Sequence, residues 1–442
     1  MKPAAVTRRR HDREILALAV PAFGALVAEP LFLMADSAIV GHLGTAQLAG
    51  VGVATAVLST ATGVFVFLAY ATTAAVARRI GAGDRRAAVQ QGIDGIWLAL
   101  LLSVGVVALT LLLAPQAVDA LGASATAAPY GVTYLRISAL GIPAVLLVMA
   151  ATGVLRGLQD TRTPLRVAIG GFAANLLLNL GLVYGAGLGV AGSAWGTVLA
   201  QTGMAGVYVL VVVRGARREG AGLRPDLPGI RACAKAGGPL MVRTLSLRGV
   251  LMVATAVAAT LGDVEVAAHQ IAMTIWIFLA FVLDAIAIAG QAIIGRYLGA
   301  SDVPGTRAAT RRMIEWGLCV GVLLGLLLVL ARPLYVPLFS SDPVVRQQLS
   351  DVLLLVALTE PVAGVVFVLD GVLMGAGDGR YLAWAMLGTF AAFAPVALLV
   401  PVLGGGLAGL WWAMNLFMLV RAAFLCLRIR TGHWLVTGAV RA

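Results

Sequence analysis

The sequence predicts an all-α integral membrane protein, with about twelve transmembrane helices arranged as two lobes of six. Composition is the first observation behind this prediction. Hydrophobic residues make up 60% of the 442 residues, the mean hydropathy is +0.97, and charged residues are only 12%. Soluble domains carry about 25% charged residues, so this chain has too few to cover a water-exposed surface of its length.

The second observation is that the chain repeats its landmarks at a constant spacing. Each landmark of the first half returns 218 residues later, as 239 − 21 shows for the first pair. The repeated pairs are Pro21 and Pro239, Leu43-Gly44 and Leu261-Gly262, Gly81 to Asp84 and Gly299 to Asp302, and Gly153 to Gly157 and Gly371 to Gly375. Each half has six helices, an even number, so the second half starts on the same side of the membrane as the first. The two lobes therefore have the same orientation and are related by a pseudo-two-fold axis along the membrane normal.

Apolar segments long enough to span a bilayer, about 20 residues each, give the elements in order. The first lobe holds segments 14–41, 49–78, 86–114, 128–158, 163–184 and 188–214. The second lobe holds segments 231–260, 265–297, 304–331, 344–375, 380–402 and 405–430. The predicted domains are an N-terminal segment 1–13, an N-lobe 14–214, a linker 215–230, a C-lobe 231–430 and a tail 431–442.

Arginine-rich loops alternate with loops that lack Lys and Arg, and this alternation orients the helices. Arginines gather at 8–13, 78–86 and 214–231, whereas 42–47 and 115–130 have none. Positively charged loops stay on the cytoplasmic side. We therefore expect both termini and the linker in the cytoplasm, and a multi-pass protein of the inner (plasma) membrane. Orientation then accounts for the net charge of +12 without a nucleic-acid partner.

Several function classes are disfavoured by the motifs that the sequence lacks. It has no GxxxxGK[ST] phosphate loop, so ATP hydrolysis is not expected to drive it. Its four histidines and three cysteines are scattered, without the spacing of a metal site or a disulfide framework. The polar residues at membrane depth are separated acids and amides, which makes a membrane-embedded enzyme or a scaffold the weaker alternative. We expect no catalytic residues, metal or cofactor.

Several motifs, in the right order along the chain, resemble those of the multidrug and toxic compound extrusion (MATE) transporters. They are the runs LMADSAIVGHLG at 33–44, GVLRGLQDTRTP at 153–164 and AAHQIA at 267–272. The runs LDAIAIAGQ at 283–291 and FVLDGVLMGAGD at 367–378 resemble the DinF-like branch of that family. The resemblance implies a V of two six-helix lobes around a central cavity. It also implies multidrug efflux of small, often cationic or lipophilic, molecules by antiport with H⁺ or Na⁺.

The resemblance further implies an ion-coupling and substrate site in the N-lobe. Carried over position by position, that site falls on Asp36, Thr152, Asn175, Asn179 and Thr197. Many relatives have an aspartate at the position of Asn179, so here Asp36 is the only carboxylate of the set. One acid among neutral oxygens favours a proton over Na⁺, although Na⁺ can also take its ligands from amides and hydroxyls.

Asp36 is the strongest candidate on physical grounds as well. A charged Asp at the centre of a membrane helix costs about 2.5–3.5 kcal/mol, and its repeat position is Ala254, so the duplicated framework does not require an acid. In an apolar cavity a carboxyl can take up and release a proton near neutral pH. Pro21 and Pro30 permit a kink in the same helix. The alternative is an Asp36 that is only hydrated, or paired with an arginine.

Four further residues are secondary candidates. Glu29 lies two turns before Asp36 on nearly the same helix face. Glu29 either contacts Arg248 of the seventh helix, or each of the two pairs within its own lobe. Asp284 and Asp370 lie deep in C-lobe helices, where they form either a structural hydrogen-bonded pair or a second ion site.

Two transport functions remain open. The leading hypothesis is a secondary-active exporter that works by alternating access, with a small organic cation as substrate and a monomer in the lipid bilayer as the working unit. The alternative is a flippase for lipid-linked substrates, which needs a strongly cationic cavity. The candidates inside the spans for such a cavity are Arg248, Arg243 and Arg136, so we favour export.

Overall fold

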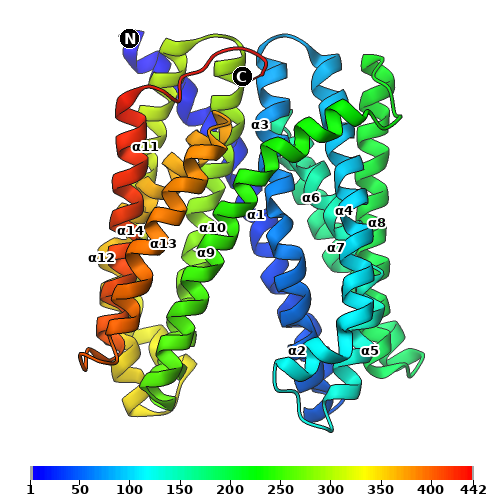
Figure 1. Cartoon of the computed structure of the whole chain (residues 1–442), viewed down its shortest axis with the longest axis vertical. Helices are drawn as coiled ribbons and strands as arrows, with labels where there is room; N and C mark the ends of the chain where they lie inside the picture. The colour runs from blue at the N-terminus through cyan, green and yellow to red at the C-terminus, as the bar shows by residue number, and fades with distance from the viewer. Residues whose placement is uncertain (1–2, 441–442) are drawn as a thin grey trace. The chain divides into compact units, whose positions relative to one another are not determined.

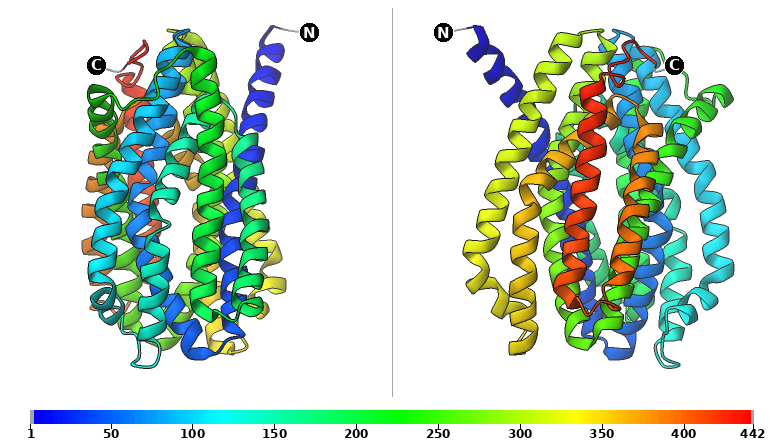
Figure 2. Two further views of the ribbon diagram at one scale, coloured as in Figure 1. Left: turned by 90° about the vertical axis from the view of Figure 1, so that its right-hand side faces the viewer. Right: turned by 60° about the vertical axis from the view of Figure 1, so that its left-hand side comes forward.

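The structure is a computed structural model that describes residues 3–440, apart from the side chains of residues 3–8 and of Glu29. This part of the chain is helical and contains no strand (Figure 1 and Figure 2). The earlier helices are α1 (Pro3–Gly41), α2 (Thr45–Gly63), η1 (Val64–Val66), α3 (Phe67–Gly81), α4 (Arg85–Ala120), α5 (Ala128–Ala139), α6 (Ile142–Gly157), α7 (Arg162–Leu180), η2 (Gly181–Gly185) and α8 (Gly189–Glu219). The later helices are α9 (Leu227–Leu261), α10 (Asp263–Gly299), α11 (Val303–Phe339), α12 (Pro343–Gly375), α13 (Gly379–Leu399) and α14 (Gly406–Thr431).

The number of membrane-spanning segments agrees with the sequence. The described residues contain eleven helical segments that are long and apolar enough to cross a bilayer, and a bent pair that makes a twelfth. That pair is α5 and α6, which meet at 50° inside the segment expected at 128–158. Pro143 lies in the first turn of α6. Because proline has no N–H, it cannot continue the hydrogen-bond ladder of α5, and the helix breaks there.

Contacts between the helices divide the chain into two compact units. The N-unit comprises Pro21–Gly238, and the C-unit comprises the residues up to Val20 together with those from Pro239 onward. Both limits fall at the duplicated prolines, inside α1 and α9, whereas the sequence analysis placed the division at the linker 215–230. Proline removes a helix hydrogen bond and permits a bend. Each of these two helices can therefore continue from one unit into the other without a break in the helix.

Repeated glycines set close helix crossings in both units. In the N-unit, a Cβ on Gly153 of α6 would lie 2.5 Å from the carbonyl oxygen of Ala69 on α3. In the C-unit, a Cβ on Gly375 of α12 would lie 2.5 Å from the carbonyl oxygen of Gln291 on α10. Gly375 is the repeat mate of Gly157, and each half carries the spacing Gly-x-x-x-Gly. Such pairs let helix backbones approach closely in lipid, so the duplication has preserved one mode of packing.

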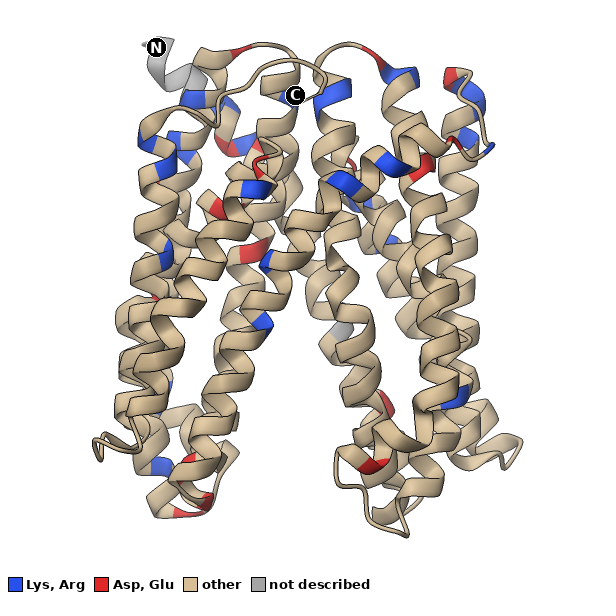
Figure 3. Cartoon of the chain, viewed as in Figure 1, with Lys and Arg blue, Asp and Glu red and all other residues tan. Residues whose placement is uncertain are grey.

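Basic residues gather at one end of each unit. Figure 3 shows Lys and Arg concentrated at the end of the C-unit where both chain termini lie. In the N-unit they are concentrated where α3 is followed by α4 and where α8 ends (Figure 3). Arg78 and Arg79 lie in the last turn of α3, and Arg217 and Arg218 in the last turn of α8. The opposite ends are poor in positive charge, as the loop pattern of the sequence predicts.

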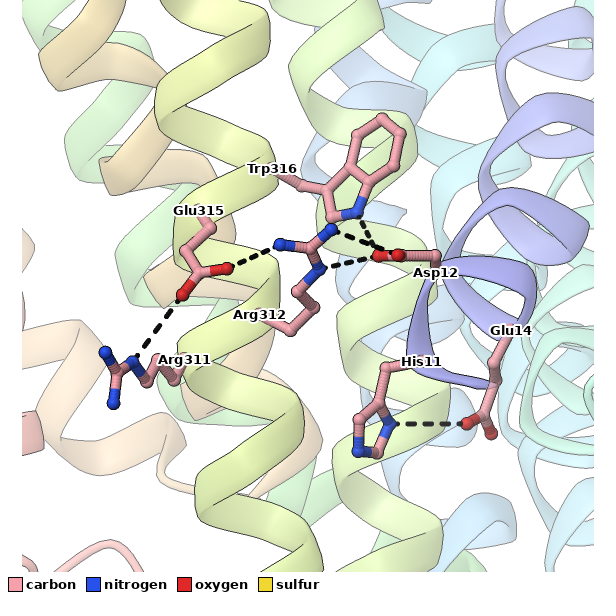
Figure 4. Close-up of polar contacts among 7 residues, drawn as sticks. All are labelled: His11, Asp12, Glu14, Arg311, Arg312, Glu315 and Trp316. Atoms are coloured by element: carbon pink, nitrogen blue, oxygen red, sulfur yellow. Dashed lines mark hydrogen bonds and ion pairs between the residues drawn. The ribbon is translucent and has the colours of Figure 1, made fainter. Parts of the chain in front are cut away.

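The first turns of α1 are anchored in the C-unit by a charged network (Figure 4). Arg312 of α11 donates to both carboxylate oxygens of Asp12, at 2.6 and 3.0 Å, and Trp316 donates its indole N–H to Asp12 at 2.8 Å. Arg296, near the end of α10, forms an ion pair with Glu14 of α1. A bidentate arginine–carboxylate pair is directional as well as strong, so it fixes both the position and the rotation of this helix end.

Candidate functional site

A buried carboxylate lies at the meeting point of four helices in the N-unit. Asp36 of α1 is only 4% exposed. It accepts hydrogen bonds from the Tyr134 hydroxyl on α5 at 3.1 Å, from the Asn179 amide on α7 at 2.8 Å, and from the Ser193 hydroxyl on α8 at 2.6 Å. Burying a carboxylate is costly unless it is paired or hydrogen-bonded, and three donors from three other helices meet that requirement.

The two amides of α7 extend this cluster. Asn175 and Asn179 are one turn apart, and the Asn179 amide donates to the Asn175 side-chain oxygen at 3.2 Å. The Asn175 amide in turn donates to the Thr197 hydroxyl on α8 at 3.2 Å. The side chain of Asn179 occupies space that a Cβ on Gly196 would fill. A continuous chain of hydrogen bonds therefore runs from the carboxylate of Asp36 to Thr197.

The electrostatics of this cluster are unusual because every described hydrogen-bond partner of Asp36 is neutral. Its partners are a phenol, an amide and a hydroxyl. The side-chain oxygen of Asn179 is buried and has no hydrogen-bond partner among the described residues. An acid with neutral donors and one spare acceptor beside it can hold a proton or a small cation. In residues 3–440, apart from the masked side chains, no group of three or more His, Cys, Asp or Glu residues could hold a metal ion.

One residue of the set implied by the sequence lies apart from this hydrogen-bond chain. Thr152 of α6 donates to the hydroxyl of Tyr208 on α8 at 3.2 Å. The structure thus joins Asp36, Asn175, Asn179 and Thr197, and it adds two residues that sequence reasoning missed, Tyr134 and Ser193. Both are polar residues within membrane-spanning helices, which is the signal that could have found them.

The acids of the C-unit have a different environment. Asp370 of α12 is 3% exposed and forms ion pairs with Arg243 of α9 and with Arg421 of α14, the latter at 2.9 Å. Asp284 of α10 is half-buried. Two guanidinium groups on other helices hold Asp370, so its surroundings are those of a structural ion network joining α9, α12 and α14.

Sequence reasoning also missed a buried acid in the C-unit. Glu360 of α12 is 2% exposed, and one of its carboxyl oxygens has no hydrogen-bond partner among the described residues. Its position in the middle of an apolar run could have singled it out, as it did for Asp36. The pairing of two other candidates is not tested by the described residues. The side chain of Glu29 lies outside the described residues, and Arg248 is a half-buried residue of α9, so their pairing stays a prediction.

The fold and the buried acid together define a class of protein. Duplicated sets of membrane-spanning helices with an ionisable residue inside one of them are features of secondary transporters. The family model described as MatE matches residues 21–180 and 239–399, and the chain belongs to this family of MATE transporters. Both matched ranges begin at the duplicated prolines that delimit the two units.

Individual relatives support this membership over nearly the whole chain. Protein DETOXIFICATION 44, chloroplastic, of Arabidopsis thaliana is 31% identical over 437 residues, which cover 95% of this chain and 83% of that protein. DNA damage-inducible protein F of Escherichia coli (strain K12) is 29% identical over 435 residues, covering 96% and 93%. The crystal structure of the Vibrio cholerae MATE transporter VcmN in the bent form matches with a TM-score of 0.87 at 22% identity, covering 96% of this chain and 98% of that one.

The comparisons confirm the MATE fold and the family resemblance that the sequence predicted. The chain is a multi-pass membrane protein of a transporter family that includes multidrug and detoxification proteins. They do not favour the flippase alternative.

Proposed function

We propose that the protein exports small, often cationic or lipophilic, molecules in exchange for protons by alternating access, with Asp36 as the coupling carboxylate. The observation that carries this proposal is a buried carboxylate whose described hydrogen-bond partners are all neutral. No described partner supplies a positive charge, so a proton or a cationic substrate can supply it. Two cations that neutralise one carboxylate compete, and such competition links the binding of one to the release of the other.

The hydrogen bonds of the cluster support a proton over Na⁺. Three donors already point at the oxygens of Asp36, and Na⁺ would need several oxygen ligands turned toward it instead. A proton needs only one acceptor. When Asp36 is protonated, its O–H can donate to the hydroxyl of Tyr134, because a phenol can both donate and accept. The Tyr134 hydroxyl would then rotate. The hydrogen bond between α1 and α5 would change its direction, with Asp36 as the donor, and would not be lost.

Movement of α1 completes the proposed mechanism. Pro21 and Pro30 lie inside this helix, where each removes a backbone hydrogen bond and permits bending. Neutral Asp36 holds the amide of Asn179 less strongly than the carboxylate does, since hydrogen bonds to charged groups are about twice as strong as neutral ones. Protonation therefore loosens α1 from α7 and α8 at Asp36, and α1 can bend.

The orientation in the membrane belongs to the same proposal. The basic ends of both units would face the cytoplasm, which places both termini and the linker 215–230 there. The charge distribution of Figure 3 supports this assignment. Epitope tags at either terminus or at residue 222 should be unreachable by antibody in intact cells and reachable after permeabilisation. Labelling of any of the three tags from outside would contradict the orientation.

Transport in proteoliposomes tests the coupling. Wild-type protein should drive uptake of a fluorescent organic cation when a pH gradient is imposed, and should not respond to a Na⁺ gradient alone. Asp36→Asn should fold and insert normally, yet lose gradient-driven transport and proton release on substrate binding. Tyr134→Phe is the matched control, because it removes one hydrogen bond to the carboxylate and keeps the acid.

Two results would contradict the proposal. Wild-type rates in Asp36→Asn together with lost transport in Glu360→Gln would place the ion site in the C-unit. Transport that follows the Na⁺ gradient and ignores the pH gradient would overturn proton coupling while leaving Asp36 as the ion ligand.

A further inference from the structure

The C-unit carries a cavity of about 580 Å³ that the transport mechanism does not use. The early turns of α11, the last turn of α14 and the chain that follows α14 form its walls. Three of the lining residues are arginines. Arg307 and Arg311 belong to α11, and Arg430 belongs to α14. Among the described lining residues, Glu315 of α11 is the one acidic side chain.

The chain after α14 builds one wall of this cavity. Gly432 ends α14 in the left-handed conformation, with φ 71°, and so turns the chain away from the helix axis. The side chain of Trp434 is only 2% exposed, and its indole N–H donates to the carbonyl of Ile429 at 3.2 Å. Further along, the Gly438 N–H donates to the carbonyl of Leu298, near the end of α10, at 3.0 Å. The wall is therefore held at both ends, by α14 and by α10.

The cavity has a surplus of positive charge. Arg307 and Arg430 are exposed and have no ion pair or hydrogen bond within the described part of the chain. Arg311 approaches Glu315 at 3.5 Å, but Glu315 is also bound at 2.6 Å by Arg312. Guanidinium groups match the geometry of phosphate oxygens and can bind them bidentately. Two unpaired guanidiniums facing one cavity therefore favour an anionic group with several oxygens.

The position of the cavity along the helices corresponds to the headgroup layer of a membrane. A helix of 37 residues such as α11 is about 55 Å long at 1.5 Å per residue, whereas the hydrocarbon core is about 30 Å thick. Its ends must therefore extend beyond the hydrocarbon. Arg307 is in the second turn of α11, and Arg430 is the last residue but one of α14.

The rest of the lining is apolar. Ile314, Ile429, Trp434 and Leu435 line the cavity together with the arginines. A soluble anion would gain nothing from these side chains, whereas an amphipathic ligand would bury apolar surface on them. Tryptophan is also the residue type enriched at the membrane–water interface.

We propose that this cavity is a binding site for the headgroup of an anionic phospholipid. The phosphate lies between Arg307 and Arg430, and the first part of the acyl chains covers the apolar wall formed by Ile314, Ile429 and Leu435. The site adjoins the network that anchors α1, because Glu315 contacts both Arg311 of the cavity and Arg312, the partner of Asp12 (Figure 4). Lipid occupancy at this place would thus act next to the beginning of α1.

Lipid titration of the purified, delipidated full-length protein tests the site. Short-chain phosphatidylglycerol is added in detergent, and retained lipid is counted by native mass spectrometry, with zwitterionic phosphatidylcholine as the comparison without net charge. The variant Arg307→Gln/Arg430→Gln should bind phosphatidylglycerol about tenfold or more weakly, because it loses both charge-assisted contacts to the phosphate. Arg217→Gln/Arg218→Gln removes the same charge from exposed positions at the end of α8, which do not line this cavity, and should bind like the wild type.

A second arm separates a lipid from a free anion. Inorganic phosphate should not displace phosphatidylglycerol, since it cannot use the apolar wall. Displacement at equal concentration would overturn the assignment to a lipid. An equal loss of binding in both double variants would show general surface attraction and overturn the site, as would equal binding of phosphatidylglycerol and phosphatidylcholine. Arg307→Lys/Arg430→Lys keeps the charge and should recover part of the affinity, which checks that the loss comes from the headgroup contact.

Discussion

Two equally buried aspartates with opposite surroundings give a sharp test of the roles assigned to the two units. Asp370 is 3% exposed and lies between the guanidinium groups of Arg243 and Arg421. Asp36 is 4% exposed and is held by neutral donors. The substitution Asp→Asn removes the charge at either position and leaves the size of the side chain unchanged. The Asp370→Asn variant should therefore lose more stability than the Asp36→Asn variant.

The magnitudes follow from the partners. Asp370→Asn leaves two buried guanidiniums without their carboxylate, and breaking a buried pair in this way costs about 3–5 kcal/mol. For a unit of this size, 1 kcal/mol shifts the melting temperature by about 2–4 °C, so the expected decrease is about 6–20 °C. Asp36→Asn leaves no charge uncompensated and weakens one or two hydrogen bonds, at about 1 kcal/mol each. Its expected decrease is about 2–8 °C.

Thermal unfolding in detergent, followed by fluorescence-detected size-exclusion chromatography, measures both variants beside the wild type. Transport is measured on the same preparations. The triple change Asp370→Asn with Arg243→Gln and Arg421→Gln should melt above Asp370→Asn alone, because it also removes the two buried positive charges that Asp370 compensates. If Asp370→Asn melts within a few degrees of the wild type and has lost transport, Asp370 is an ion-coupling residue and its assignment to a structural network is wrong.

Two other predictions concern the anchor of α1 and the helix crossings. A double-mutant cycle with Asp12→Asn and Arg312→Gln should give a coupling free energy of about 1–2 kcal/mol, because the pair is bidentate but partly exposed to solvent; additive melting shifts would show that the pair contributes nothing to holding α1. Gly153→Ala should lower the stability by about 1–3 kcal/mol, since its Cβ would meet the backbone of α3. Gly52→Ala is the matched control, with no atom within 4 Å of its Cβ, and similar melting temperatures for the two alanine variants would refute the close crossing.

The sequence by itself determined the fold of this protein to a large extent. In a bilayer the backbone N–H and C=O groups of a single spanning segment can be satisfied only by forming a helix. Each long apolar run was therefore expected to be an α-helix. The duplication then marked the same landmarks twice, and the Gly-x-x-x-Gly pairs at 153–157 and 371–375 do form the helix crossings of both units. The bend between α5 and α6 and the division at Pro21 and Pro239 were not predicted, because a local bend does not change the hydropathy of a segment.

Only the tertiary structure decided which polar residues meet. Helical periodicity places Asn175 and Asn179 on one face of α7, and the family resemblance placed Asp36 near them. Neither could show that Tyr134 and Ser193 complete the cluster, or that Thr152 pairs with Tyr208 instead. The same holds for Asp370, whose two arginine partners lie 127 and 51 residues away in sequence. The physical reason is that periodicity fixes the face on which a side chain lies within one helix, whereas the rotation and spacing of the packed helices decide what that face meets.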